Sequence, residues 1–90
     1  YTQCAPWVVH AHFKDWDLVS PEEGREGVDG RYYRAALIGE GIVDHRSCLV
    51  AMEAANYEGY INLEYEGNEY PPAEAVRKAT AYLRGLREGI

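Results

Sequence analysis

Two histidines and a lysine are spaced in this sequence as if to do chemistry together. His10, His12 and Lys14 occupy every second position of VVHAHFKDW, residues 8–16. In a β-strand, residues two apart share a face, so we expect these side chains on one face, opposite an apolar face. Polar groups on such a face need hydrogen bonds, a charge partner, a metal ion or solvent.

A similar alternation recurs in YINLEYEG, residues 60–67, where Asn62 and Glu64 share a face. His12 and Glu64 each lie toward the C-terminal end of an expected strand. A neutral imidazole and a carboxylate at neighbouring strand ends can bind a divalent metal ion, and the carboxylate can act as a general base. Periodicity alone also fits a structural interpretation, with His12 hydrogen-bonded in the interior and Glu64 paired with Lys14.

The elements that must position these residues alternate between strand and helix. The sequence predicts strands at about 7–14 and 60–65, a long surface loop over 16–41, and helices at about 45–56 and 72–87. Strands separated by helices indicate parallel pairing. Because the polar faces do not suit a sheet covered by helices on both sides, the pattern favours a (β/α)8 barrel, whose chemistry lies at the C-terminal strand ends.

Local signals set the expected helix limits and faces. Asp44 stands at the N-cap position of the first helix, and Pro72 at the first turn of the second. In the second helix, Val76, Ala79 and Leu83 form an apolar stripe that is expected to face the core.

Composition limits the classes of function. The chain has 90 residues, 47% of them hydrophobic, which is enough for one domain at most. Fifteen acidic residues outnumber nine basic ones, which argues against binding to nucleic acid. No run of ~18 apolar residues predicts a membrane span. Cys4 and Cys48 have no metal-site spacing and are expected to be reduced thiols of a cytoplasmic protein.

Three stretches resemble the C-terminal quarter of the xylose isomerase-like TIM barrels, the sugar phosphate isomerase/epimerase superfamily. They are VVHAHFKDW, ALIGEGIVD and ANYEGYINLEYEG. They resemble, in order, an H-x-H-x-K-D strand, a G-E-G turn before a helix, and a Tyr- and Gly-containing turn before a strand that ends in Glu. The resemblance extends over about residues 5–87.

The resemblance implies a metal-dependent enzyme that acts on a sugar or sugar phosphate. One divalent ion, Mn, Mg, Co or Zn, would be held at the barrel mouth by Glu, Asp, His and Glu. Carried over by position, His12 is the metal-binding histidine and Glu64 the last carboxylate ligand, while the other Glu and the Asp are not in this chain. Glu64 would also transfer a proton at a sugar enediolate, as in isomerases and epimerases. A lyase of the inosose dehydratase type would have the same metal ligands.

A related branch, the zinc-dependent AP endonucleases, fits less well. Those enzymes resemble this chain at the G-E-G turn but carry an Asp-x-His pair just before it. This sequence has Tyr33 and Ala35 at those positions, which leaves a trinuclear zinc site without its ligands.

Five further residues receive weaker assignments. His10 is one layer deeper than His12 and is expected to support the ligands or to pack. Lys14 and Arg34 could contact substrate oxygens. Glu40 is expected to stabilise the G-E-G turn, and His45, in the first helical turn, to be exposed to solvent.

The sequence also predicts that the barrel is incomplete. Two strand-helix units are a quarter of the eight in a barrel of ~250 residues. The chain opens at YTQCAP without an initiating Met, which suggests a C-terminal fragment that is inactive alone and needs the rest of the barrel or self-association. The alternative is a noncatalytic αβ module, which associates through its strands and whose His and Glu are structural.

Overall fold

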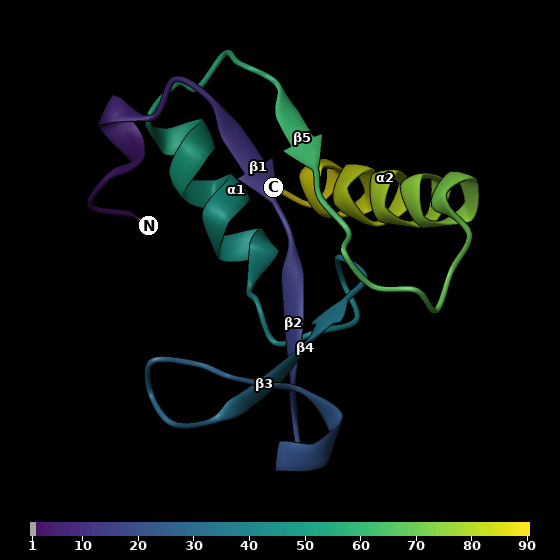
Figure 1. Ribbon diagram of the computed structural model, residues 1–90. Coiled ribbons are helices and arrows are strands. Elements are labelled where there is room, and N and C mark those ends of the chain that lie inside the picture. Colours follow the sequence, from purple (N-terminus) through teal and green to yellow (C-terminus); the bar gives the residue numbers. More distant parts are fainter. Residues whose placement is uncertain (1) are drawn as a thin grey trace.

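The computed structural model describes residues 2–90 and contains a short parallel sheet flanked by two helices (Figure 1). β1 (Ala11–Phe13) pairs in parallel with β5 (Ile61–Leu63), and His12 lies opposite Asn62. The parallel arrangement expected from the sequence is therefore present. Both strands are shorter than predicted. Ahead of β1, the chain forms the 3₁₀ turn η1 (Ala5–Trp7), where Pro6 favours a turn.

The region predicted as a loop over 16–41 is instead an antiparallel sheet, and this expectation was wrong. Its strands lie in the order β2-β4-β3 and span β2 (Asp15–Val19), β3 (Arg25–Glu26) and β4 (Tyr32–Ala36), with a 3₁₀ turn η2 (Pro21–Glu23) between the first two. Glycine, proline and charge are concentrated in the connections, whereas Trp16, Leu18 and Tyr33 lie in the paired strands. Aromatic and apolar side chains stabilise such pairs across strands.

The two helices lie close to the predicted positions. α1 (His45–Ala54) begins after Asp44, whose carboxylate accepts hydrogen bonds from the Ser47 N–H at 3.1 Å and the Ser47 hydroxyl at 2.6 Å. This N-cap satisfies a donor that the first helical turn leaves free. α2 (Pro72–Glu88) starts with proline, which has no N–H to leave unpaired.

None of the helices described over residues 2–90 combines the length and the apolar character that crossing a membrane requires.

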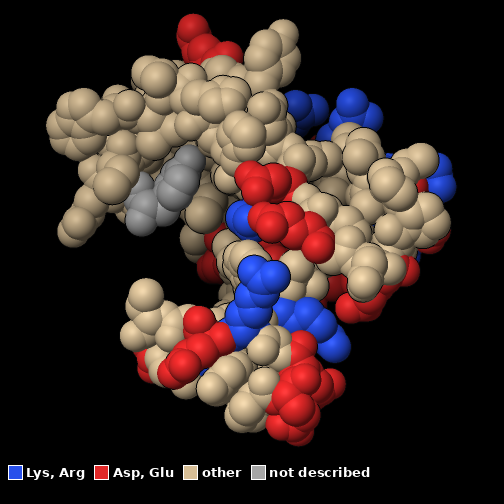
Figure 2. Space-filling view, in the orientation of Figure 1, with Lys and Arg blue, Asp and Glu red and all other residues tan. Residues whose placement is uncertain are grey.

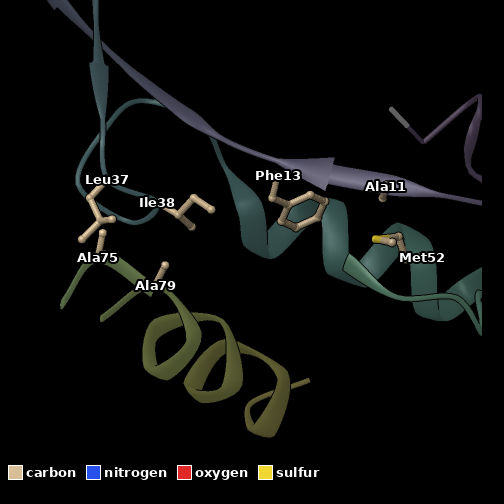
Figure 3. Close-up of a cluster of buried hydrophobic side chains, with 7 residues drawn as sticks. All are labelled: Ala11, Phe13, Leu37, Ile38, Met52, Ala75 and Ala79. Carbon is tan, nitrogen blue, oxygen red and sulfur yellow. The ribbon is translucent and has the colours of Figure 1, made fainter. Parts of the chain in front are cut away.

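One apolar cluster joins β1, the segment after β4, and both helices (Figure 3). Figure 3 shows Leu37 and Ile38 beside small residues of α2, and Phe13 and Met52 farther along β1 and α1. The buried members are Ala11, Phe13, Leu37, Ile38, Met52, Ala75 and Ala79. The core face of α2 thus contains Ala75 and Ala79, and Val76 of the predicted stripe is 56% exposed.

Within residues 2–90, the parallel sheet has only two strands, so the outer edges of β1 and β5 have no strand partner. Backbone N–H and C=O groups along such edges are available to further strands.

Candidate metal and substrate site

The two residues predicted as metal ligands are brought together at the C-terminal end of the parallel sheet. His12 Nδ1 lies 3.3 Å from Glu64 Oε1. The register places His12 opposite Asn62, and the Glu64 N–H donates to the Phe13 carbonyl at 2.8 Å, which continues the strand pairing by one residue. The side chains of His12 and Glu64 are 48% and 41% exposed, so both are accessible from solvent.

Lys14 lies beside this pair and contacts two carboxylates. Its Nζ donates to Glu64 Oε2 at 3.1 Å and also to Glu66, and it lies 5.1 Å from the centre of the Trp16 ring. Hydrogen bonds from Lys14 hold the pKa of Glu64 below its ordinary value, whereas Glu66 first and Glu64 second raise the pKa of Lys14. Lys14 is therefore an ammonium and Glu64 a carboxylate at neutral pH.

Sequence reasoning missed Glu66 as a member of this group. The signal was present, since Glu66 follows Glu64 at the period of two that had located Asn62 and Glu64. In Figure 2, acidic and basic side chains gather where the parallel sheet meets the antiparallel sheet. Water reaches these groups, so their mutual attraction is screened.

His10 contacts the predicted ligand from the N-terminal side of β1. Its Nε2 lies 3.0 Å from His12 Nε2, and Asn62 Nδ2 lies 3.4 Å from the same atom. If His12 donates through Nδ1 to Glu64, its Nε2 carries the lone pair and accepts from these two neighbours. In this tautomer His10 and Asn62 already occupy the Nε2 lone pair of His12, and a metal ion bound at that nitrogen would have to displace them.

The nitrogen of His12 and the oxygens of Glu64 are donor types that suit a divalent metal ion. Two residues are too few to complete its coordination shell. Imidazole nitrogen and carboxylate oxygen both bind Mn²⁺, Co²⁺ and Zn²⁺. Across residues 2–90 no group of three His, Cys, Asp or Glu side chains is arranged to hold a metal ion. His12 and Glu64 would by themselves supply only two ligands to a divalent ion.

Arg34, predicted to contact substrate, lies against carboxylates from two connecting segments. Its guanidinium nitrogens are 3.9 Å from Glu23 and 3.9 Å from Glu69. The side chain is 47% exposed. Arg34 therefore bridges the antiparallel sheet and the segment before α2.

Glu40 connects the G-E-G turn to the segment before α2. The Tyr70 hydroxyl donates to both carboxylate oxygens of Glu40, at 2.9 and 2.8 Å. The adjacent carboxylate raises the pKa of Tyr70, so the hydroxyl stays protonated as the donor. This contact agrees with the stabilising role expected for Glu40.

His45 is buried, and the expectation that it would be exposed was wrong. Only 2% of the residue is accessible, because the start of α1 packs beneath β1 and the imidazole lies 5.2 Å from the Phe13 ring. Its Nε2 donates to the Lys14 carbonyl oxygen at 2.9 Å. A residue in the first turn of a helix usually faces solvent, and only the tertiary packing reverses this here.

Asp15, which sequence reasoning did not include in the site, is the most buried charged residue. It is 1% exposed and accepts hydrogen bonds from four backbone N–H groups, those of Trp16, Gly39, Gly41 and Val43. The signal in the sequence was an acidic residue in the position after Lys14 together with two glycines, Gly39 and Gly41, that expose their N–H groups.

A hollow of about 360 Å³ extends from the site toward α1. It is lined by residues of β1 and of the start of α1, among them His10, His12, Lys14, Val43, His45 and Cys48.

The two cysteines, Cys4 and Cys48, are free thiols.

The family model described as xylose isomerase-like TIM barrel matches residues 3–86. No match was found among curated proteins or among solved structures.

Proposed function

Since the chain belongs to the xylose isomerase-like TIM barrel family, we propose that it forms the C-terminal quarter of a divalent-metal-dependent isomerase or epimerase of sugars or sugar phosphates. The observation that carries the proposal is the 3.3 Å contact between His12 and Glu64 at the C-terminal ends of two adjacent parallel strands. In (β/α)8 barrels, active sites are built at this end of the strands.

The architecture of the parallel sheet supports the barrel assignment. β1 and β5 are two of the eight strands that such a barrel needs, and each has an outer edge without a strand partner within residues 2–90. Further strands would pair at these edges and bring the missing ligands to the same mouth. We therefore expect the 90-residue chain alone to lack turnover.

His12 and Glu64 would hold the metal ion together with carboxylates from those other strands. A divalent ion in that position supplies polarisation of the sugar carbonyl and of the neighbouring hydroxyl. Glu64 would remove a proton from the carbon next to the carbonyl, which gives an enediolate. An isomerase would return the proton to the former carbonyl carbon, and an epimerase would return one to the same carbon from the opposite face, through a second glutamate from another strand. Lys14, whose Nζ lies 3.1 Å from Glu64 Oε2, stabilises the ionised form of Glu64 and could orient a substrate oxygen.

A structural role for these residues is the second candidate, and one observation favours it. Glu64 already has partners for both oxygens, with His12 near Oε1 and Lys14 on Oε2. In that case His12 and Glu64 would join the two strands of a noncatalytic αβ module.

The deciding experiment uses the complete polypeptide that contains these residues. Mn²⁺ binding is measured by calorimetry, and turnover on a panel of ketoses, their phosphates and inososes. We expect Glu64→Gln to weaken Mn²⁺ binding and to lower turnover by about 10²- to 10⁴-fold, whereas Lys14→Met has a smaller effect on both.

Glu69→Gln is the matched control, because Glu69 lies in the same segment but faces Arg34. It should leave both quantities unchanged. If Glu64→Gln keeps full metal binding and at least half of the activity, the metal assignment is wrong and the structural role replaces it.

A further inference from the structure

The carboxylate of Asp15 is held almost entirely by backbone N–H groups. Oδ1 accepts from Trp16 at 2.9 Å and Val43 at 3.0 Å, and Oδ2 accepts from Gly39 and Gly41, each at 3.1 Å. The imidazole of His45 is also close, but its Nδ1 lies 3.9 Å from Oδ2, beyond hydrogen-bonding distance. Three of these donors, Gly39, Gly41 and Val43, belong to the 39–43 turn, so their hydrogen bonds hold this turn against the start of β2.

The two glycines of the turn permit this close approach. A Cβ added at Gly41 would lie 2.3 Å from Asp15 Oδ1 and 2.4 Å from the Trp16 carbonyl oxygen. Gly39 has φ of +97°, and a Cβ there would meet the Tyr82 ring of α2 at 2.8 Å. The turn therefore contacts β2 on one side and α2 on the other.

His45 fixes the same strand end at the preceding residue. Its Nε2 donates to the Lys14 carbonyl oxygen, and its ring is almost fully enclosed. The backbone on either side of the Lys14–Asp15 peptide is thus held from the buried side. The side chains of His12 and Lys14 lie on the opposite, more open side, where they contact His10, Glu64, Glu66 and the Trp16 ring.

From this geometry we infer that Asp15 and His45 are positioning residues for the metal site, because they fix the backbone from which His12 and Lys14 project. We call Asp15, His45 and the turn at 39–43 the clamp. The inference rests on the proposed function for its effect on metal binding. Its effect on the strand end does not depend on that function.

The first test measures the strand end directly in the complete polypeptide, without metal. The reporter is hydrogen exchange of the Glu64 amide, which donates to the Phe13 carbonyl at 2.8 Å. Asp15→Asn and His45→Leu should each accelerate this exchange by at least about ten-fold relative to amides in the middle of α2. His45→Gln should preserve most of the protection, because its amide can still donate to the Lys14 carbonyl.

The second test measures Mn²⁺ affinity and kinetics on the same variants. Asp15→Asn and His45→Leu should weaken Mn²⁺ binding by about ten-fold, as loss of supporting contacts around a metal ligand does, and should lower kcat more than they raise KM. Asp17→Asn is the matched control in β2: it is the same substitution at a partly exposed aspartate, and it should leave metal affinity and Glu64 exchange unchanged.

The outcomes separate this inference from the proposed function. If the wild-type protein neither binds Mn²⁺ nor turns over any substrate of the panel, the proposed function fails. Hydrogen exchange of the Glu64 amide then tests by itself whether the clamp fixes the strand end. If Asp15→Asn does not fold, the comparison of His45→Leu with His45→Gln decides. Two results would overturn the inference. One is that the Glu64 amide of folded His45→Leu exchanges no faster, relative to the amides of α2, than in the wild-type protein. The other is that the wild-type protein binds Mn²⁺ and the variants bind it with the same affinity.

Discussion

Lys14 and Asp15 are adjacent in the chain and have opposite environments. The Lys14 side chain is 33% exposed and contacts the carboxylates of Glu64 and Glu66, whereas the Asp15 side chain is inaccessible and contacts four backbone N–H groups. The groups suited to chemistry lie on the open side of the strand end, and the groups that fix its position lie on the buried side. The difference shows that backbone groups hold the buried side of this strand end, whereas side-chain contacts make up its open side.

The largest expected effect tests this contrast through stability. Asp15→Ala removes the acceptor of four partly buried backbone N–H groups, and each donor left unsatisfied adds to the cost. We expect the free energy of unfolding of the complete polypeptide to fall by about 3 kcal/mol or more. Lys14→Met, one residue earlier, should change it by less than about 0.5 kcal/mol, as for other exposed ion pairs.

Both values come from urea unfolding curves of the complete polypeptide. Asp17→Ala provides the control for a loss of negative charge in β2 and should resemble Lys14→Met. Equal destabilisation by Asp15→Ala and Lys14→Met would contradict the distinction between the two sides of the strand end.

A smaller effect concerns the pKa of Lys14 on the open side. Glu66 is the main cause of its rise above 10.5, so Glu66→Gln should lower the pKa of Lys14, and Glu64→Gln should lower it less. Because the folded-state pKa is raised, the contribution of the contact to stability is present at neutral pH and is lost as the pH rises through that value. An NMR titration of the lysine side chain measures the shift.

Glu69→Gln is again the control, since Glu69 faces Arg34. A larger drop in the pKa of Lys14 with Glu64→Gln than with Glu66→Gln would mean that Lys14 is bound mainly to the proposed metal ligand.

The smallest effect compares the two thiols. Cys48 lies in α1, three residues after His45, and partial burial raises the pKa of its thiol, whereas Cys4 is exposed. Since the thiolate is the reactive form, iodoacetamide should modify Cys4 faster than Cys48 at pH 8. Peptide mass spectrometry over time measures the two rates, and faster modification of Cys48 would show that the environment around α1 is open.

The exposed face of the parallel sheet could be predicted from the sequence because it follows a local period. Alternation in residues 8–16 and 60–67 placed His12 and Glu64 on the same side of their strands, and parallel pairing then brought them together. Asp44 marked the start of α1 by the ordinary preference for an N-cap. These features depend on residues within a few positions of one another.

The antiparallel sheet and the clamp could not be predicted in this way, because they depend on long-range contacts. Asp15 of β2 pairs with Ala36 of β4. A local alternation of residue types does not predict this pairing, because a stretch rich in glycine and charge separates the two strands. The burial of His45 results from α1 packing beneath β1, although its position in the first turn indicated exposure. In α2, Ala79 of the predicted stripe is buried, but Ala75 and not its neighbour Val76 lies in the core.

The clamp also has a consequence for how this region can diverge among relatives. The segment from β2 to β4, residues 15–36, is anchored at both ends. Asp15 pairs with Ala36, and the turn that follows β4 donates hydrogen bonds to Asp15. Insertions, deletions and substitutions at its far end, residues 20–31, can therefore accumulate without transmitting a displacement to Lys14. Sequence changes in residues 20–31 would alter the surface that this segment offers to a ligand, while the backbone of Lys14 and Asp15 keeps its position.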